Sequence, residues 1–484
     1  MRPAADLDVP LALERASPVP LHVQLAAALR SAALDGLLPP GSRMPPTRVL
    51  AARLGVARST VLAAYEQLDG EGFLEGRHGS GTFLSASLAA AGVPPRPSGR
   101  GPGDAPRPLP GVVDLRPGRP STRRLADPAW TRAWRAAVAE VPDVEGPPEG
   151  LPELREEIAA HLRAARGLDA RAEDVLVTAG TGEALSLLAH ALDLPGRPVV
   201  VEDPGYPAAR AVLTRHRGEL VGVPVDDDGL VVDALPRGGP APALVFVTPS
   251  HQYPLGGRLP LQRRLALLRW AQERGTVVVE DDYDGEFRFD VAPLPALAGL
   301  DRGGRVVYVG TFSKVLTPWL RMGYVVVPPA LGAAVRSVRG DLGTPVSALD
   351  QRALARYLAA GSLRRHIARS RRDYAHVRAR LERLLAPHPR LRLRGLEAGL
   401  HAVVDLPAGA DAAAVLARVA DGGVLLADLA AYALDPAAPG HGPAVVLGYG
   451  SATLGELERA VGLLLAAVGE RAAPAPVSRS GGAP

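Results

Sequence analysis

The chain has a single lysine, and that lysine lies in a polar setting. Of the 55 lysine and arginine residues among 484, all but Lys314 are arginine. Arginine carries a positive charge, but its pKa above about 12 keeps it from losing a proton and attacking a carbonyl, as a lysine amine can. Lys314 directly follows the apolar run of residues 305–313 (RVVYVGTFS), on a loop rich in Gly, Ser and Thr. This context favours a nucleophilic amine over a surface lysine retained by chance.

Hydroxyl and guanidinium groups flank this amine. Thr311 and Ser313 lie beside Lys314, and Arg321 follows seven residues later. An amine that can form a Schiff base, next to groups that bind phosphate, suits pyridoxal 5′-phosphate (PLP), an aldehyde that carries a phosphate. The residues therefore predict a PLP site with Lys314 as its catalytic residue.

A PLP site also needs a buried carboxylate that keeps the pyridine nitrogen protonated, because the protonated ring is the electron sink. The run VVVEDDYDGEFR (277–288) places Asp281 at the end of a buried strand, with Tyr283 on the same side of an extended chain. Tyr283 can donate a hydrogen bond to the phenolic oxygen of the cofactor. The alternative is a solvated acidic loop, which is disfavoured because the acids directly continue a Val-Val-Val strand.

Two further segments fit the same cofactor. The run VTAGTGEALSLLAHAL (177–192) is typical of a strand, a glycine-rich turn and a helix. Its turn places the backbone N–H groups of Gly180, Thr181 and Gly182 at a helix start, where phosphate binds. Tyr206, which follows a Pro-Gly pair, is a candidate to cover the face of the ring, and the alternative is a plain turn residue.

These candidates lie at or near the ends of apolar runs that alternate with helical patterns. Six near-continuous β-branched runs are predicted strands: residues 175–180, 198–203, 243–250, 276–283, 305–313 and 324–328. Such runs occur in sheets covered on both faces, so we predict an α/β domain with a mostly parallel sheet.

The N-terminal part of the chain indicates DNA binding. Residues 47–54 and 58–69 are predicted to form two helices joined by a tight turn. The inward-facing apolar positions of the second helix leave Arg58, Ser59 and Thr60 on its first turn, where a recognition helix meets base edges and phosphates. The alternative is a helical hairpin that only packs.

A wing is predicted next. The segment FLEGRHGSGTFL (73–84) is typical of two strands joined by a glycine-rich tip that bears Arg77, His78 and Gly79. Glycine lets the backbone approach a phosphate closely. Between residues 36 and 65 the chain has four arginines and no acid, so one face can be basic.

The segment from residue 20 to residue 84, which includes RVLAARLGVARSTVLAAYEQLDGEGFL, resembles the winged helix-turn-helix of the GntR family of bacterial regulators. This resemblance implies that six residues contact DNA: Arg48, Arg58, Ser59, Thr60, His78 and Gly79. Pro46 and Ala57 depart from the family, which usually has a Ser or Thr helix cap at both positions, and each lost cap costs about 1 kcal/mol.

The PLP residues, in this order, resemble those of fold-type I aminotransferases. Together with VTPSHQYPLGG (247–257), they resemble most closely the MocR/GabR subfamily of GntR regulators, which join an aminotransferase-like domain to the winged helix. In that subfamily, PLP and an amino-compound effector alter how a homodimer engages double-stranded operator DNA. The resemblance implies these cofactor contacts: Lys314, Asp281 at the pyridine nitrogen, Tyr283 and more loosely Gln252 near O3′, Tyr206 on the ring, and Thr181, Ser313 and Arg321 on the phosphate.

We accordingly predict four parts of the chain. They are a winged helix-turn-helix over 15–87, a flexible Pro/Gly/Arg-rich linker over 88–122, an aminotransferase-like α/β domain with a small C-terminal α+β subdomain over 123–470, and a disordered tail over 471–484.

We expect a PLP-responsive transcriptional regulator. The alternatives are an active aminotransferase with an accessory DNA-binding domain, and a repressor that has lost its cofactor. The retained Lys314 and Asp281 argue against the repressor. Val446 argues against turnover, because aminotransferases that bind an α-carboxylate have an arginine just before the LGY-like residues of AVVLGYG (444–450). Either the effector lacks that carboxylate or another arginine supplies the charge.

Two departures concern charge. Glu183 follows the predicted phosphate turn, and because an acid would repel phosphate we expect its side chain to point away. Residues 361–395 hold eleven arginines and two acids, which form either a solvated helix face or a surface that contacts DNA phosphates.

Composition excludes several classes of protein. The chain has no cysteine, which rules out a disulfide framework, a thiol nucleophile and thiolate metal sites. No apolar run approaches the roughly 18–20 residues of a membrane span, and acids occur where a signal peptide would be apolar. We therefore expect a cytoplasmic protein without membrane contact or a metal site.

Overall fold

The structure is a computed structural model that describes residues 13–15, 17–34, 37–77, 81–86, 111–125, 127–140, 146–289, 295–435 and 442–469. The chain divides into two compact units, residues 1–107 and 108–484. Among the described helices, none combines the length and the apolar composition needed to cross a bilayer.

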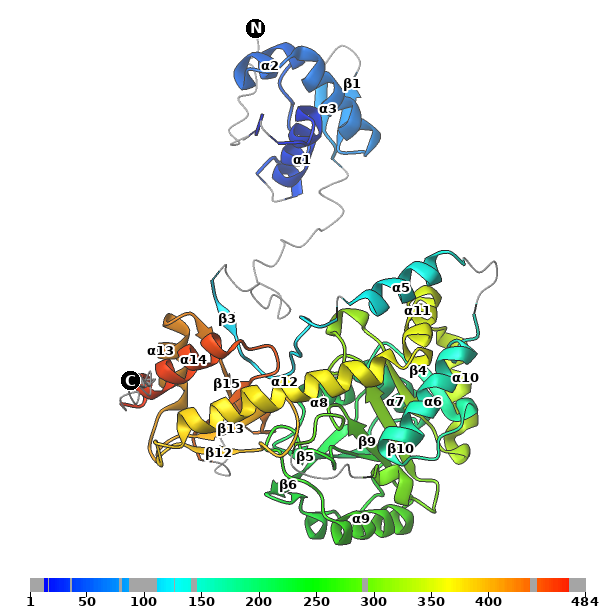
Figure 1. The fold of residues 1–484 in the computed structure, drawn as a ribbon. Helices are drawn as coiled ribbons and strands as arrows, with labels where there is room; N and C mark the ends of the chain where they lie inside the picture. Colours follow the sequence, from blue (N-terminus) through cyan, green and yellow to red (C-terminus); the bar gives the residue numbers. More distant parts are fainter. Residues whose placement is uncertain are drawn as a thin grey trace. The chain divides into compact units, whose positions relative to one another are not determined.

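The described residues of the first unit form three helices and a two-stranded antiparallel hairpin (Figure 1). Its elements are α1 (Leu21–Leu34), α2 (Thr47–Leu54), α3 (Arg58–Gly70), β1 (Leu74–Arg77) and β2 (Gly81–Leu84). Val61, Tyr65 and Leu68 of α3 are buried against α1 and α2 residues in one apolar cluster. The predicted helix pair and wing strands are confirmed.

An eight-stranded sheet forms the centre of the second unit, in the order β4-β11-β10-β9-β8-β5-β6-β7. Its strands are β4 (Val175–Thr178), β5 (Pro198–Asp203), β6 (Glu219–Asp226), β7 (Gly229–Leu230), β8 (Leu244–Val247), β9 (Val277–Asp282), β10 (Val306–Thr311) and β11 (Gly323–Val326). The five strands β10, β9, β8, β5 and β6 are parallel neighbours, whereas β11 runs antiparallel to both β10 and β4. The six predicted strands and the mostly parallel sheet are confirmed.

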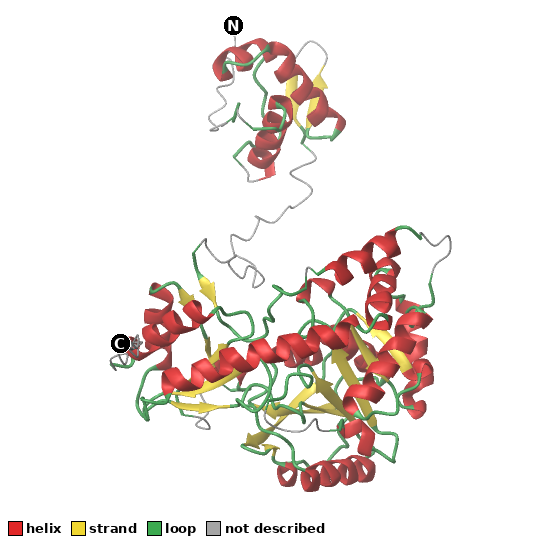
Figure 2. Ribbon diagram, viewed as in Figure 1, coloured by secondary structure: helices red, strands yellow, loops and turns green. Residues whose placement is uncertain are grey.

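Helices lie on both faces of this sheet (Figure 2). The helices of this part of the chain are α5 (Pro128–Val138), α6 (Pro152–Arg166), α7 (Thr181–Ala191), α8 (Pro207–Arg215), α9 (Leu261–Arg274), α10 (Pro329–Leu342), α11 (Ala348–Ala359) and α12 (Ser362–Leu385). Within β5, Val199 packs in a cluster with Leu185 of α7, while Val200 packs in a separate cluster with Leu267 of α9. Burial on both faces explains why the strands are apolar at nearly every position.

A smaller α+β part follows α12, which spans the distance between the two parts in Figure 1. Its antiparallel sheet has the order β12-β13-β16-β15. The elements are β12 (Arg392–Arg394), β13 (His401–Asp405), α13 (Ala412–Asp421), β14 (Val424–Leu425), β15 (Ala427–Asp428), β16 (Ala444–Gly448) and α14 (Leu454–Ala467). Short 3₁₀ helices are η1 (Ala172–Asp174), η2 (Val232–Ala234), η3 (Leu297–Leu300), η4 (Pro318–Leu320) and η5 (Leu429–Tyr432).

The structure differs from the predicted linker at its C-terminal end. Residues 111–125 form an arm on the large unit, in which β3 (Val113–Asp114) pairs in parallel with β14. Leu115 is buried, and its carbonyl accepts a hydrogen bond from Gly448 N at 2.7 Å. The short apolar run at 112–115 anchors the arm, although its surroundings have the composition of a linker. Residues 88–110 and 471–484 lie outside the described residues.

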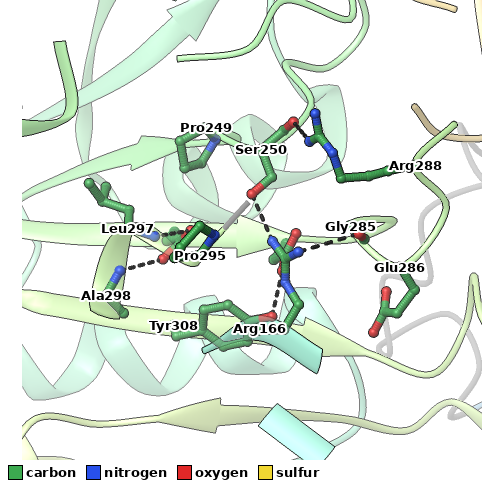
Figure 3. A network of polar contacts seen from close by, with 12 residues as sticks. Arg166, Pro249, Ser250, Gly285, Glu286, Arg288, Pro295, Leu297, Ala298 and Tyr308 are labelled. Carbon is green, nitrogen blue, oxygen red and sulfur yellow. Dashed lines mark hydrogen bonds and ion pairs between the residues drawn. The ribbon is translucent and has the colours of Figure 1, made fainter. Parts of the chain in front are cut away.

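A buried network around Arg166 joins α6, the strands β9 and β10, and the loops that follow β8 and β9 (Figure 3). Arg166, at the end of α6, donates from Nε to Asp282 Oδ2 at 2.5 Å and from Nη2 to Ser250 Oγ at 2.9 Å. The Tyr308 hydroxyl donates to the same Asp282 oxygen at 2.6 Å. Arg166 Nη1 also donates to the Gly285 carbonyl. The network therefore fixes the loops that follow β8 and β9.

Replacing Arg166 by Met is expected to lower the free energy of unfolding of the large unit by about 3–5 kcal/mol, because Asp282 becomes an unpaired buried charge. Urea unfolding followed by tryptophan fluorescence measures this loss, since all four tryptophans of the chain lie in this unit. Glu156→Gln, at an exposed position of the same helix, should cost at most about 0.5 kcal/mol. Equal losses in the two variants would contradict this account.

Candidate functional site

A cavity of about 880 Å³ lies at the C-terminal ends of β9 and β10. Nine of the ten predicted cofactor residues line it: Gly180, Thr181, Gly182, Tyr206, Asp281, Tyr283, Ser313, Lys314 and Arg321. The parallel pairing of β9 with β10 sets Asp281 beside Val309, so the residues that follow the two strands face one space.

Lys314 follows β10 by three residues and is half-buried. Its Nζ donates to the carbonyl of Gly118, on the arm, at 2.7 Å. Burial lowers the pKa of the amine, while the carboxylates of Asp284 and Asp281 act in the opposite direction. A lowered pKa favours the nucleophilic, unprotonated amine.

The arm approaches the amine closely because residue 118 is glycine. Gly118 has a φ of +98°, and a Cβ atom at this position would lie 3.1 Å from Lys314 Nζ. Both the backbone conformation and the space therefore favour glycine.

Asp281 is 3% exposed, at the end of β9. Its Oδ1 atom is buried and has no hydrogen-bond partner among the described residues. Burial, with a further contribution from Asp282, raises the pKa of Asp281 to about 8. A buried carboxylate without a partner is costly, so this oxygen suits a ligand that brings a proton or a positive charge.

Tyr283 reaches the cavity beside a polar cluster that the sequence did not single out. Its hydroxyl lies 2.8 Å from His251 Nδ1, which in turn lies 3.0 Å from Asp284 Oδ2. His401 also lines the cavity, and burial lowers its pKa to about 3, so it is neutral. Ligand atoms of His251, Asp284 and His401 lie within 4.8 Å of one another, but the first two bond each other and His401 Nε2 contacts the Pro254 carbonyl.

A second group of predicted cofactor residues lies around the start of α7. Gly180 is the N-cap of α7 with a φ of +99°, and Thr181 begins the helix. Tyr206 lies near both Asp281 and Arg321, whose charges act on its hydroxyl, and burial raises the pKa of Tyr206 to about 12. The positive end of a helix dipole with Thr, Ser and Arg side chains is an anion site.

Glu183 points away from this anion site, as expected. Its Oε1 lies 2.7 Å from Nη2 of the buried Arg339, and its Oε2 accepts a hydrogen bond from Ala179 N. The acid is therefore engaged on the far side of the helix start.

Gln252 is the predicted cofactor residue that the structure does not bring into the cavity. Its Nε2 donates to Glu202 Oε2 at 3.2 Å and to the carbonyls of Pro204 and Tyr253 at 2.9 and 2.8 Å. Glu202 also accepts from Thr248, which does line the cavity. Burial raises the pKa of Glu202 to about 7. Gln252 thus holds the wall of the cavity.

Val446, which stands where an arginine was expected, is fully buried on β16 between β13 and β15. It packs in an apolar cluster with Leu429 and Tyr432. The cavity instead has a different arginine, Arg119 on the arm. Sequence reasoning missed Arg119, Gly118 and His401, and the strand-like run at 112–115 was the available signal for the first two.

The predicted DNA-contacting residues gather at the start of two helices. Arg48, Arg58 and Ser59 are exposed and Thr60 is half-buried. Arg58 Nε donates to Thr47 Oγ1 at 3.3 Å, which joins the first turns of α2 and α3. The N-caps of the two helices are Pro46 and Ala57, and neither side chain makes a capping hydrogen bond, as expected. His78, Gly79 and the side chain of Arg77 lie outside the described residues.

The arginine-rich stretch is largely helix α12. Several of its arginines bind carboxylates of the same unit, including Arg369 with Asp127 and Arg380 with Glu458. These pairs favour a structural role for that part of the stretch.

Without any ligand, the contribution of Asp281 to stability is expected to fall as the pH rises from about 4 to about 8. Unfolded Asp281 loses its proton near its ordinary pKa of 3.8, whereas folded Asp281 keeps its proton up to about pH 8. The unfolded state therefore binds fewer protons in this window, and folding loses free energy as the pH rises. Asp281→Asn removes this contribution, so its Tm at pH 8 should exceed that of the unmodified protein, and the gap should close toward pH 4.

Asp233→Asn is the matched control, because the Asp233 side chain is exposed. It should retain the pH profile of the unmodified protein. An Asp281→Asn variant with no gain in Tm at pH 8 would contradict the expectation that the ionised Asp281 carboxylate destabilises the folded protein.

Two family profiles match the chain. Residues 21–84 match the bacterial regulatory proteins of the gntR family, and residues 125–443 match aminotransferase class I and II. The two matches correspond to the two units and confirm the predicted resemblance.

Curated relatives and solved structures agree with these two family matches. The HTH-type pyridoxine biosynthesis transcriptional regulator PdxR of Corynebacterium glutamicum is 43% identical over 400 residues, 82% of this chain and 86% of the relative. The probable rhizopine catabolism regulatory protein MocR of Rhizobium meliloti is 40% identical over 382 residues, 75% of this chain and 77% of the relative. The crystal structure of LysN, an alpha-aminoadipate aminotransferase from Thermus thermophilus complexed with N-(5′-phosphopyridoxyl)-L-leucine, is 29% identical, covers 75% of this chain and 93% of that one, and has a TM-score of 0.66. The chain therefore belongs to the MocR/GabR subfamily of GntR transcriptional regulators, in which a winged helix-turn-helix precedes an aminotransferase-like domain.

Proposed function

We propose that this regulator binds PLP on Lys314 and that the bound cofactor, with an amino-compound effector, changes how the protein binds operator DNA. The observation that carries the proposal is the pairing of two groups in one cavity: the single lysine of the chain and a buried Asp281 oxygen with no partner among the described residues. PLP satisfies both, because it brings an aldehyde for the amine and a pyridinium N–H for the carboxylate.

The other residues of the cavity have distinct tasks in this proposal. When bound, PLP supplies an electrophilic carbon and an electron sink. The start of α7, with Thr181, Ser313 and Arg321, holds the phosphate, and Tyr206 covers the ring. Tyr283 donates its hydroxyl proton to the O3′ side, and His251 keeps that hydroxyl in place at 2.8 Å.

The arm offers a route from the cofactor to the DNA-binding unit. It begins directly after residues 88–110, which join the two units in sequence, and its Gly118 carbonyl accepts a hydrogen bond from Lys314. A lysine engaged by the cofactor has fewer N–H groups to donate to Gly118, so loading of the site acts directly on the arm. The name of the Corynebacterium relative, a regulator of pyridoxine biosynthesis, agrees with PLP as a sensed ligand.

The proposal includes a homodimer that works in the cytoplasm, where its operator DNA lies. Trp319 at the rim of the cavity is 92% exposed. Tryptophan is enriched in protein–protein interfaces, and in the proposed homodimer a second copy of the chain covers this side chain.

The absorption spectrum tests the cofactor assignment. The purified protein incubated with PLP should show a visible band from lysine-bound PLP, and Lys314→Ala should lack that band because it has no amine to react. Unchanged tryptophan fluorescence would show that the variant is folded. A protein that stays colourless with PLP, or a Lys314→Ala variant with the same band, would contradict the proposal.

The recognition helix is tested by operator binding. Arg58→Ala should weaken binding by about tenfold and reduce its salt dependence, because an exposed arginine at the start of α3 is lost. Arg30→Ala is the matched control, since Arg30 lies on α1 and its Nη2 is paired with Glu71 Oε2 at 2.6 Å. Equal effects of the two substitutions in a gel-shift titration would contradict the assigned face.

A further inference from the structure

The cavity contains an arginine whose task the cofactor does not explain. Among the described lining residues, the cationic side chains are Lys314, Arg321 and Arg119. Lys314 is assigned to the aldehyde and Arg321 to the phosphate. Arg119 comes from the arm, next to the residue whose carbonyl contacts Lys314. It remains available for another anion.

The arm places Arg119 beside the strand that lacks the expected arginine. A Cβ atom at Gly448 would lie 2.9 Å from the Arg116 carbonyl oxygen, and one at Gly450 would lie 2.7 Å from the Arg119 carbonyl oxygen. Glycine at these two positions therefore lets the arm lie against the end of β16, just beyond Val446. Arg119 of the arm thus lines the cavity near the strand that lacks the expected arginine.

The charge of Arg119 is only partly compensated. The Asp114 side chain is 3% exposed and is gripped by Arg116 through Nε at 2.9 Å and Nη2 at 2.7 Å. Arg119 pairs with the same carboxylate through Nη2, at 2.5 Å. Two guanidinium groups share one carboxylate, which leaves a net positive charge. The Arg119 side chain is 47% exposed, so it has donors left for a ligand.

Neighbouring groups are less suited to this task. Arg116 makes the bidentate pair with Asp114 and does not line the cavity. His401 lines the cavity but is buried and neutral, so it cannot pair with an anion. Val446 is apolar and faces a buried cluster.

We infer that Arg119 binds the carboxylate of the effector, so that the effector class is an amino acid rather than a simple amine. This inference rests on the proposed function, because the amino group of the same effector would meet the cofactor at Lys314. It also gives the carboxylate a direct effect on the arm, because binding would draw Arg119 away from Asp114. A carboxylate and a guanidinium form strong paired hydrogen bonds, which makes the distinction measurable.

The test uses stable reduced adducts of the cofactor, so it requires no turnover. Calorimetry on the full chain freed of PLP compares the N-(5′-phosphopyridoxyl) adducts of glycine, β-alanine and 4-aminobutyrate. Each is matched with the adduct of methylamine, ethylamine or propylamine, which lacks only the carboxylate. In the unmodified protein, the carboxylate is expected to improve affinity by about ten- to a hundredfold for at least one chain length.

Arg119→Gln should reduce this preference to less than about threefold while the amine adducts bind as before, which shows that the pocket is intact. Arg123→Gln, which changes an exposed arginine of the arm that does not line the cavity, should keep the preference. The inference is overturned if Arg119→Gln retains the preference, if it weakens both kinds of adduct equally, or if the unmodified protein shows no preference. Binding of neither kind of adduct would instead contradict the proposed cofactor site.

Discussion

A buried carboxylate oxygen without a partner is the constraint around which the large unit is arranged. Asp281 lies on a central strand that is buried on both faces, and its Oδ1 atom has no hydrogen-bond partner among the described residues. The protein keeps the group at the cost of a strongly raised pKa. Such an acid can pair with the pyridinium nitrogen of a cofactor whose aldehyde reacts with an amine. Lys314 lies in the same cavity and offers that amine.

Neighbouring segments fix the position of Asp281 although the burial of its carboxylate costs free energy. Asp282, the next residue, points to the other side of the strand and is neutralised by Arg166. Arg264 donates to the carbonyls of Leu259 and Pro249, and so ties α9 to the loop after β8. The loop that carries His251 and Gln252 is therefore held by Arg166 and by Arg264. These two contacts position the residues of the loop that face the cavity. Polar networks of this kind position a site and do not themselves touch a ligand.

Much of this site could be predicted because its residues are unusual for their positions. One lysine in a chain of arginines, and an acid directly after three valines, contradict the local pattern and so indicate function. Gln252 was assigned to the cofactor from resemblance alone, and its amide instead satisfies the buried Glu202. Which partner a side chain chooses depends on packing across the sheet, and spacing along the chain does not contain that information.

The arm could not be predicted for a related reason. Its residues share the Pro, Gly and Arg content of the preceding segment, and only the short run at 112–115 sets it apart. Pairing with β14, more than 300 residues later in the chain, gives this run its place. Arg119 became visible as a cavity residue only through that long-range contact.

We expect that occupation of Lys314 by PLP is coupled to DNA binding. The most direct measurement is the affinity of the full chain for its own promoter DNA, titrated with and without PLP, for the unmodified protein and for Lys314→Ala. PLP is expected to change the affinity of the unmodified protein at least about fivefold, the lower range of allosteric coupling, and to leave the affinity of the variant unchanged. An equal response of both proteins to PLP, or no response of either, would contradict it.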